Sequence, residues 1–181
     1  MKLTLIANID DNFGLGFKND LLYKIPSDMK FFKKITSLGK FNVIIMGRKT
    51  FESIGNTPLP NRINIILSSK TDHVIPKEYT ESLVYYNSIS TILAWLESTR
   101  LSYNVNKEDF NVCVIGGSQV YERFLPIGTN LALCRVYAND KEADTWFPKI
   151  DFEDWDLISE TDRVLDPFYN KEFNFVEYKR K

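Results

Sequence analysis

Asp28 is an acid within a segment that otherwise has the pattern of an amphipathic helix. The segment from Ile25 to Leu38 reads I-P-S-D-M-K-F-F-K-K-I-T-S-L. At about 100° per residue, its apolar side chains fall on one side and its lysines on the other. Asp28 is predicted to lie on the apolar side, between Phe32 and Ile35. The apolar residues expected on that side are Met29, Phe31, Phe32, Ile35 and Leu38.

Two roles fit this acid. A first-turn aspartate can cap a helix or complement its dipole, which contributes about 0.3–1 kcal/mol. Ser27 already offers a capping oxygen, with Pro26 at the predicted start of the helix and Gly39 at its end. Desolvation can raise the pKa of a carboxyl group by up to about 3–5 units, so a buried acid needs a partner. In the second role, Asp28 lies at the mouth of an apolar pocket and accepts hydrogen bonds from a ligand.

A strand-to-helix turn at Gly47 suits a phosphate group. The apolar run 41–46 ends there, and the short helix that follows begins with R-K-T. Cations at a helix start oppose the helix dipole, and an anion beside Arg48 and Lys49 would remove that conflict. Two solvated surface cations are the alternative.

A second turn of this kind follows the apolar run 110–115. Gly116 and Gly117 precede a helix that begins S-Q-V-Y. Strand, glycine pair and helix form a dinucleotide cradle in many α/β proteins, although glycine pairs also serve as plain tight turns. The full G-x-G-x-x-G motif is absent.

The composition predicts one compact domain without nucleic-acid or membrane partners. The chain has 181 residues, of which 44% are hydrophobic, and its 23 basic residues nearly balance 24 acidic ones. Nucleic-acid and membrane partners usually require a basic surplus. No run reaches the ~20 apolar residues of a membrane span.

Cysteine and histidine usage argues against metal binding. With the single histidine His73 and no Cys-x-x-Cys spacing, no metal site is expected. Cys113 and Cys134 lie in apolar runs, which is typical of buried thiols in a reducing compartment. The apolar run at the N-terminus is too short for a signal sequence, so we expect a cytoplasmic protein.

Strands alternate with helices along most of the chain, and only strands follow at the end. Helices are predicted at 25–38, after Gly47, at 88–97 with Ser88 or Ser90 as the cap, and after Gly117. Apolar runs predict strands at 2–9, 41–46, 63–67, 83–86, 110–115, 131–137 and 155–159, and period-2 alternation predicts an antiparallel strand in F-N-F-V-E-Y. The order predicts an α/β three-layer fold: a mostly parallel eight-stranded sheet with an antiparallel C-terminal edge strand and about four flanking helices.

Two segments are predicted to lack regular structure. Residues 10–20 form a Gly- and Asn-rich loop, which is either a functional cover or a plain surface connection. Residues 100–109 are polar and are predicted to be a surface insertion.

Taken in order, the motifs resemble the dihydrofolate reductase family. They are P-S-D-M-K-F-F, V-I-I-M-G-R-K-T-F-E-S-I-G, P-L-P-N-R, V-I-G-G-S-Q-V-Y and D-T-W-F-P, and the resemblance extends over nearly the whole chain. It implies NADPH-dependent reduction of 7,8-dihydrofolate to 5,6,7,8-tetrahydrofolate, by hydride transfer to C6 and protonation at N5, which supplies one-carbon metabolism. It implies a single domain over residues 1–181, with a subdomain over roughly 42–105 that binds the adenosine of the cofactor. A monomer that also binds antifolate inhibitors is expected.

The resemblance also implies roles for particular residues. Asp28 would bind the 2-amino group and N3 of the pterin while N5 is protonated, and Arg62 would pair with the α-carboxylate of the folate glutamate. A cis peptide bond is expected between Gly116 and Gly117. The other residues expected to contact the substrate are Ile6, Asn8, Met29, Phe32, Thr50, Ile54, Leu59, Ile115 and Tyr121. The residues expected to contact NADPH are Asn8, Leu15, Gly16, Asn19, Gly47, Arg48, Lys49, Thr50, Leu67, Ser68, Ser69, Ile115, Gly116, Gly117, Ser118, Gln119, Val120, Tyr121 and Thr145.

Three places depart from the family's pattern. Tyr23 stands where the family has a tryptophan that helps to hold a water near the pterin, and its hydroxyl is expected to take over that catalytic role. Cys134 stands where a threonine hydrogen-bonds the catalytic acid, and its thiol is a weaker donor. Ser118 and Gln119 follow the glycine pair where many relatives have another glycine and a basic residue. Asp28, Tyr23 and Cys134 are the predicted catalytic residues.

Two other functions are weighed against this one. A related reductase that acts on a ribosylamino-pyrimidine in riboflavin synthesis shares the fold and NADPH, but the P-S-D-M-K-F-F helix with Arg62 favours folate. A non-catalytic nucleotide- or folate-binding homologue is supported only by the changes at Tyr23 and Cys134. A nucleotide kinase is excluded, because no G-x-x-x-x-G-K-[ST] motif is present.

Overall fold

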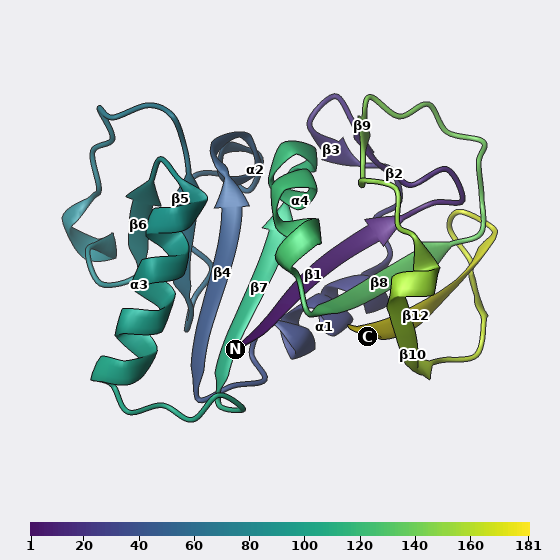
Figure 1. Ribbon diagram of the computed structural model, residues 1–181. Coiled ribbons are helices and arrows are strands. Elements are labelled where there is room, and N and C mark those ends of the chain that lie inside the picture. Colours follow the sequence, from purple (N-terminus) through teal and green to yellow (C-terminus); the bar gives the residue numbers. More distant parts are fainter.

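A twisted sheet runs through the middle of the molecule, and the computed structural model describes it over residues 1–181 (Figure 1). Its strand order is β10-β12-β8-β1-β7-β4-β5-β6, and β11 also pairs with β12. The bounds are Lys2–Ile9 for β1, Phe41–Gly47 for β4, Ile63–Leu67 for β5, Leu83–Tyr86 for β6, Phe110–Gly116 for β7, Asn130–Val136 for β8, Trp155–Glu160 for β10, Val164–Asp166 for β11 and Lys171–Arg180 for β12.

The sheet is parallel from β8 to β6 and antiparallel at its other end. β1, β4, β5, β6, β7 and β8 pair in parallel, and β12 runs antiparallel to β8. β10 and β11 pair antiparallel with β12 on its outer side. The predicted α/β fold, with a mostly parallel sheet and an antiparallel C-terminal strand, is confirmed.

Four α-helices cover the two faces of this sheet (Figure 1). They are α1 (Pro26–Ile35), α2 (Arg48–Ser53), α3 (Ile89–Ser102) and α4 (Ser118–Phe124). Because side chains alternate along a strand, each central strand contributes to both faces. Val43 and Ile45 of β4 pack in the larger core with α3 and α4, whereas Ile44 and Met46 pack in a second core with α1 and α2.

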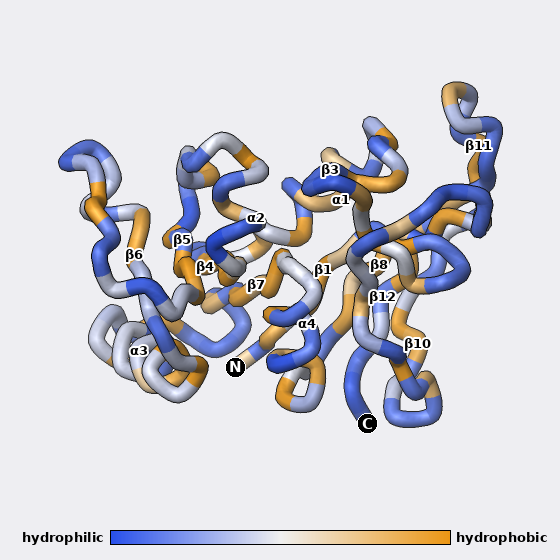
Figure 2. Tube along the Cα trace, turned by 90° about the horizontal axis from the view of Figure 1, so that it is seen from above, coloured by the Kyte–Doolittle hydropathy of each residue, from blue (hydrophilic) through white to orange (hydrophobic).

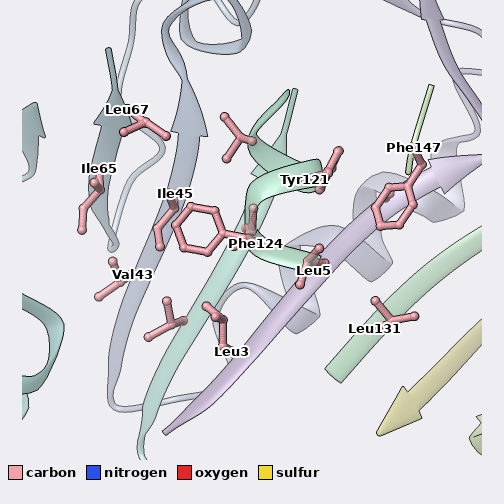
Figure 3. Close-up of a cluster of buried hydrophobic side chains, with 14 of the residues drawn as sticks. Leu3, Leu5, Val43, Ile45, Ile65, Leu67, Tyr121, Phe124, Leu131 and Phe147 are labelled. Carbon is pink, nitrogen blue, oxygen red and sulfur yellow. The ribbon is translucent and has the colours of Figure 1, made fainter. Parts of the chain in front are cut away.

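The larger core is built from strand residues and one side of α4. Figure 3 shows Phe124 of α4 among Leu5 of β1 and Ile45 of β4. Figure 2 shows many hydrophobic residues in the central strands and mostly hydrophilic ones in the outer loops. No helix combines the length and the apolar character that crossing a membrane requires.

Helix α1 begins and ends differently from the prediction. Its N-cap residue is Ile25, and no side chain caps it, so the predicted capping role of Ser27 is wrong. Pro26 occupies the first helical position, where its missing N–H is not needed, and this places Ser27 inside the first turn. The helix ends at Ile35, with Thr36 as C-cap, and does not extend to Gly39.

Two residues predicted on the apolar side of α1 are exposed. Met29 is 60% exposed and Leu38 is 53% exposed. Leu38 lies beyond the end of the helix, so the helical count does not apply to it. Phe31 and Phe32 are partly buried against the second core, and Ile35 is buried within it.

The predicted loop over residues 10–20 contains strands, which corrects that expectation. β2 (Gly14–Phe17) and β3 (Asp20–Leu21) form a hairpin, and β9 (Thr145–Trp146) pairs with β2 to complete a second, three-stranded sheet. Strands of two to four residues leave no periodic pattern, and β9 lies far away in sequence.

The segment predicted as an insertion after residue 99 begins within α3. The helix continues to Ser102, and Arg100 forms an ion pair with Glu97 (2.6 Å). The cap of α3 is Ser88, whose hydroxyl accepts a hydrogen bond from the Thr91 N–H (3.2 Å).

Candidate active site

The predicted site residues meet at one edge of the main sheet. β1, β7 and β4 are parallel neighbours, and their carboxyl ends lie near Asn8, Gly116 and Gly47. Ligands of open parallel α/β sheets bind at this edge. The sheet thus brings Asn8, which hydrogen-bonds Asp28, to the same side of the molecule as the glycines of the predicted phosphate site.

Asp28 is buried in the first turn of α1 and points toward β1. Its side chain is 8% exposed, and Oδ2 accepts a hydrogen bond from Nδ2 of Asn8 (3.0 Å). The same Nδ2 donates to the carbonyl of Tyr23 (3.1 Å). Asp28 caps no helix, but as an acid in the first turn of α1 it still complements the helix dipole.

The surroundings of Asp28 perturb its ionisation. Burial raises the pKa of this carboxyl group above its usual range, and hydrogen bonds from Asn8 and Cys134 oppose that rise because they stabilise the carboxylate. A buried acid with so few donors provides a strong acceptor for a ligand that carries N–H groups.

Cys134 lies directly opposite Asn8 in the parallel pairing of β1 with β8. It is fully buried beside Asp28, and each of the two groups affects the pKa of the other. Burial and the Asp28 charge raise the thiol pKa above its usual range, so the group stays protonated and can donate. The structure therefore brings Cys134 beside Asp28, as the resemblance implied.

We expect Cys134→Thr to leave kcat/KM for dihydrofolate unchanged or to improve it. A hydroxyl donates a stronger hydrogen bond to the Asp28 carboxylate than a thiol does. Cys134→Ala, which removes the donor, is the matched control and should be less active than Cys134→Thr. Steady-state kinetics on the purified variants measures both. A loss above tenfold in Cys134→Thr, about 1.4 kcal/mol, would show that the site is fitted to sulfur.

The Tyr23 hydroxyl hydrogen-bonds Asp140 and forms no hydrogen bond with Asp28, and its catalytic role stays a prediction. The side chain is 1% exposed, and its hydroxyl donates to Oδ1 of Asp140 (2.8 Å). Burial and the Asp140 carboxylate raise the phenol pKa above its usual range, so the phenol stays protonated. The reason for this orientation is the charged acceptor that Asp140 provides. It is the backbone carbonyl of Tyr23 that shares Asn8 with Asp28.

Arg62 is a buried cation without a carboxylate partner. It is 9% exposed, Nη1 donates to Oγ1 of Thr36 (2.7 Å), and Nε donates to the Pro60 carbonyl (3.0 Å). Burial lowers the pKa of the guanidinium, which nevertheless stays protonated at neutral pH. Thr36 lies at the end of α1, so the helix that carries Asp28 also orients Arg62.

Two helix starts lie side by side at the predicted cofactor site. Gly47 and Gly117 are the N-caps of α2 and α4, and no side chain caps either helix. A Cβ on Gly117 would come within 3.2 Å of Oγ1 of Thr50, and one on Gly47 within 3.1 Å of Val120. The peptide between Gly116 and Gly117 is cis, as predicted. The free N–H groups of both first turns are thus open to an anion.

Of the two cations at the start of α2, one forms an ion pair within the helix and the other does not. Arg48 forms an ion pair with Glu52 one turn along the helix, whereas Lys49 is exposed without a partner. Glu52 partly offsets the unfavourable charge of Arg48 at the helix start. Lys49 is the cation left free for a ligand.

Several residues predicted to contact the substrate or the cofactor form hydrogen bonds with backbone carbonyls of the protein. The Tyr121 hydroxyl donates to the Ile6 carbonyl (2.6 Å), and the Ser118 hydroxyl donates to the Trp146 carbonyl (2.5 Å). The Thr145 hydroxyl donates to the Gly16 carbonyl (3.2 Å). The predicted apolar contacts that pack around the second core are Ile6, Phe32, Leu59 and Ile115. Met29 and Ile54 are exposed.

A cavity of about 370 Å³ lies between β6 and the segment that follows β5. His73, the single histidine of the chain, stacks on Tyr85 (ring centroids 3.9 Å apart, interplanar angle 11°). Its Nε2 lies 2.9 Å from the hydroxyl of Ser68, a predicted phosphate contact. The lining residues are Lys70, Thr71, His73, Ile75, Val84, Tyr85, Tyr86 and Asn87. His73 was missed because only its position in the fold, and no motif, brings it to Ser68.

A parallel sheet that carries two glycine-started helices and a buried acid at its carboxyl edge places the chain among the nucleotide-binding α/β enzymes. A family model described as dihydrofolate reductase matches residues 2–180. Dihydrofolate reductase of Saccharomyces cerevisiae is 36% identical over 178 residues, which covers 93% of this chain and 80% of the relative. The enzyme of Bacillus subtilis is 33% identical over 179 residues, which covers 99% of this chain and 95% of the relative.

A solved structure agrees with these sequence comparisons. Dihydrofolate reductase from Enterococcus faecalis, complexed with NADP(H) and RAB-propyl, superposes with a TM-score of 0.78 at 28% identity. The match covers 99% of this chain and 96% of that one. The chain belongs to the dihydrofolate reductase family, and the predicted family is confirmed.

Proposed function

We infer that this protein reduces 7,8-dihydrofolate to 5,6,7,8-tetrahydrofolate with NADPH, and so supplies one-carbon metabolism. The observation that carries this function is the buried Asp28 carboxylate, held by Asn8 and Cys134 at the carboxyl edge of the sheet. It occurs in a chain that matches the dihydrofolate reductase family over residues 2–180.

We propose that Asp28 binds the 2-amino group and N3 of the pterin. Burial raises the pKa of this carboxyl group, and hydrogen bonds from these two N–H groups would stabilise the carboxylate. Asn8 fixes the orientation of the carboxylate through Nδ2, so the pterin plane is fixed in turn. Held in this way, the ring is positioned for protonation at N5.

Arg62 is proposed to bind the α-carboxylate of the folate glutamate. A guanidinium forms two parallel hydrogen bonds with a carboxylate, and Arg62 has no carboxylate of the protein to occupy it. Thr36 and Pro60 fix the guanidinium plane before the ligand arrives.

The residues at the two helix starts fit a dinucleotide. Glycine at 47 and 117 lets the two helix starts pack closely together, since a Cβ there would approach Val120 and Thr50. Lys49 and the free N–H groups of the first turns suit its phosphates. NADPH, when bound, supplies the hydride that goes to C6 of dihydrofolate. The contact residues named from the resemblance stay our proposal for this site.

We expect His73→Ala to raise the KM for NADPH about tenfold and to leave the KM for NADH within twofold. We propose that the imidazole, stacked on Tyr85 beside Ser68, hydrogen-bonds the 2′-phosphate that NADH lacks. A hydrogen bond to a charged group contributes about 1.5–3 kcal/mol, and 1.4 kcal/mol is tenfold in affinity. His73→Gln, which keeps a donor, is the matched control. Equal changes for both cofactors would exclude this contact.

The function is tested by the loss of NADPH absorbance on addition of dihydrofolate. NADH in place of NADPH and a diaminopyrimidine antifolate are the controls. We expect oxidation that prefers NADPH and that the antifolate abolishes. Absence of oxidation while both ligands bind would instead favour the non-catalytic homologue. Oxidation with a ribosylamino-pyrimidine only would favour the riboflavin-pathway reductase.

We further propose that residues 1–181 act as a single, monomeric, cytoplasmic domain that binds antifolates but no nucleic acid. The part over 42–105, which contains β4, β5, β6, α2 and α3, is proposed to bind the adenosine of NADPH. The supporting observations are the nearly balanced charge of the chain and the cavity that is lined by His73, a neighbour of Ser68.

A further inference from the structure

Lys141 lies in the connection between β8 and β9, with its ammonium group between two tyrosine rings. Nζ is 4.4 Å from the ring centroid of Tyr23 and 4.1 Å from that of Tyr169. The two rings meet edge to face, with centroids 5.2 Å apart and an interplanar angle of 78°. Nζ also donates a hydrogen bond to the carbonyl of Leu22. Lys141 forms no ion pair, so these rings and this carbonyl are its partners.

This lysine and the second tyrosine contact three consecutive residues of one segment. Lys141 contacts Leu22 and Tyr23, and the Tyr169 hydroxyl accepts a hydrogen bond from the N–H of Lys24 (3.0 Å). Next to Lys141, Asp140 accepts a hydrogen bond from the Tyr23 hydroxyl (2.8 Å). The segment is thereby fixed from the β8–β9 connection and from the turn between β11 and β12.

The same segment touches the catalytic acid through a single side chain. The Tyr23 carbonyl and Oδ2 of Asp28 both accept from Nδ2 of Asn8 (3.1 and 3.0 Å). An amide that donates to two acceptors can satisfy both only while their positions are fixed. A shift of the Tyr23 backbone would therefore change the hydrogen bond that orients Asp28.

We propose that Lys141 is a positioning residue for hydride transfer, which orients Asp28 through Tyr23 and Asn8. The inference rests on the proposed function, because the step it affects is the reduction of dihydrofolate. Lys141 touches neither reactant; it acts on the geometry that Asp28 presents to the pterin. Small displacements of a reacting group reduce rates strongly, so the expected effect is on the chemical step and not on binding.

The test compares Lys141→Met, Lys141→Arg and wild type in single-turnover experiments with saturating NADPH and dihydrofolate. Methionine keeps the length and apolar stem of lysine but loses the charge and the donor. We expect hydride transfer to be about tenfold slower in Lys141→Met. The KM values should change less than about threefold, and Lys141→Arg should recover most of the rate because arginine keeps the cation and the donors. Lys107→Met, at an exposed lysine with no hydrogen bond or ion pair, is the matched control.

A variant of Tyr169, one of the two rings that contact the Lys141 ammonium group, tests whether Lys141 and Tyr169 act together. Tyr169→Leu removes one of the two rings, and it should slow hydride transfer as Lys141→Met does. The double variant should be slower by less than the two single effects combined, because both single variants remove the contact between Lys141 and Tyr169, although Tyr169→Leu also removes the acceptor of the Lys24 N–H. Additive losses would mean that the two side chains do not share a role.

The outcomes separate this inference from the proposed function. Wild-type oxidation of NADPH by dihydrofolate is the reference, and its absence would contradict the proposed function and this inference together. With wild-type turnover present, a Lys141→Met rate equal to that of Lys107→Met would overturn the inference alone. So would a melting temperature that falls with an unchanged single-turnover rate, because Lys141 would then only stabilise the fold.

Discussion

Asp28→Asn should lower kcat/KM for dihydrofolate by about 10²–10⁴-fold at neutral pH, the range typical of general acid–base groups. The amide keeps the shape of the side chain, but it cannot accept two N–H groups of the pterin as a carboxylate does. The loss should be smaller at acidic pH, where solvent protons reach N5 without help from the acid. Steady-state rates across pH, with the exposed Asp72→Asn variant as control, measure the effect. A variant that keeps near-normal kcat/KM would remove Asp28 from the mechanism.

The same variant should be more stable than wild type at neutral pH. Burial raises the pKa of Asp28 in the folded state. The folded protein therefore binds the proton of this carboxyl group more tightly than the unfolded chain does. The stabilisation from that proton is present below the unfolded pKa of about 3.9 and is lost as pH rises through the folded pKa. Asparagine carries no charge at any pH. The melting temperature of Asp28→Asn should thus exceed that of wild type at pH 7 and approach it in acid, whereas a lower melting temperature at pH 7 would mean that the carboxylate is well compensated.

Arg62→Leu should raise the KM for dihydrofolate by about 10–100-fold with little change in kcat or in the KM for NADPH. A charge-assisted hydrogen bond contributes about 1.5–3 kcal/mol, and a guanidinium can form two with one carboxylate. The protein itself supplies Arg62 with only neutral acceptors, the Thr36 hydroxyl and the Pro60 carbonyl. Removing this buried cation should not unfold the chain, because no protein carboxylate loses its partner.

A substrate without the glutamate gives the sharpest control for this prediction. A reduced pterin that lacks the glutamyl carboxylates should be used equally well by wild type and Arg62→Leu. Arg123→Leu, at an exposed arginine of α4 with no hydrogen bond or ion pair, should behave as wild type with both substrates. If Arg62→Leu were impaired equally with the truncated substrate, Arg62 would act on the fold and not on the carboxylate.

Sequence periodicity predicted the direction of Asp28 correctly. The helical repeat is insensitive to the exact ends of a helix, so Asp28 lies on the buried side even though α1 ends at Ile35. Continuous apolar runs likewise predicted the central buried strands, and period-2 alternation predicted the antiparallel C-terminal strand. The cap at Ser27 failed because Pro26 takes the first helical position, which moves the cap back by two residues, to Ile25.

Contacts that depend on irregular backbone were not predictable. The Tyr23 side chain belongs to a segment without a repeat, so nothing in the sequence directs its hydroxyl to Asp140. Lys141 reaches Tyr23 and Tyr169 from a connection that reads only as a charged loop. β9 pairs with β2 across more than a hundred residues, and pairings of that range leave no local pattern. The second sheet and the surroundings of Lys141 are therefore visible only in the three-dimensional structure.

The most direct test of the central claim follows one hydrogen atom. NADPH carrying deuterium in the transferred position at C4 is incubated with dihydrofolate and the protein, and the product is analysed by mass spectrometry and NMR. We expect tetrahydrofolate with one deuterium at C6, none in the presence of a diaminopyrimidine antifolate, and little with Asp28→Asn. Tetrahydrofolate without deuterium at C6, or no product although both ligands bind, would contradict hydride transfer at the site that Asp28 defines.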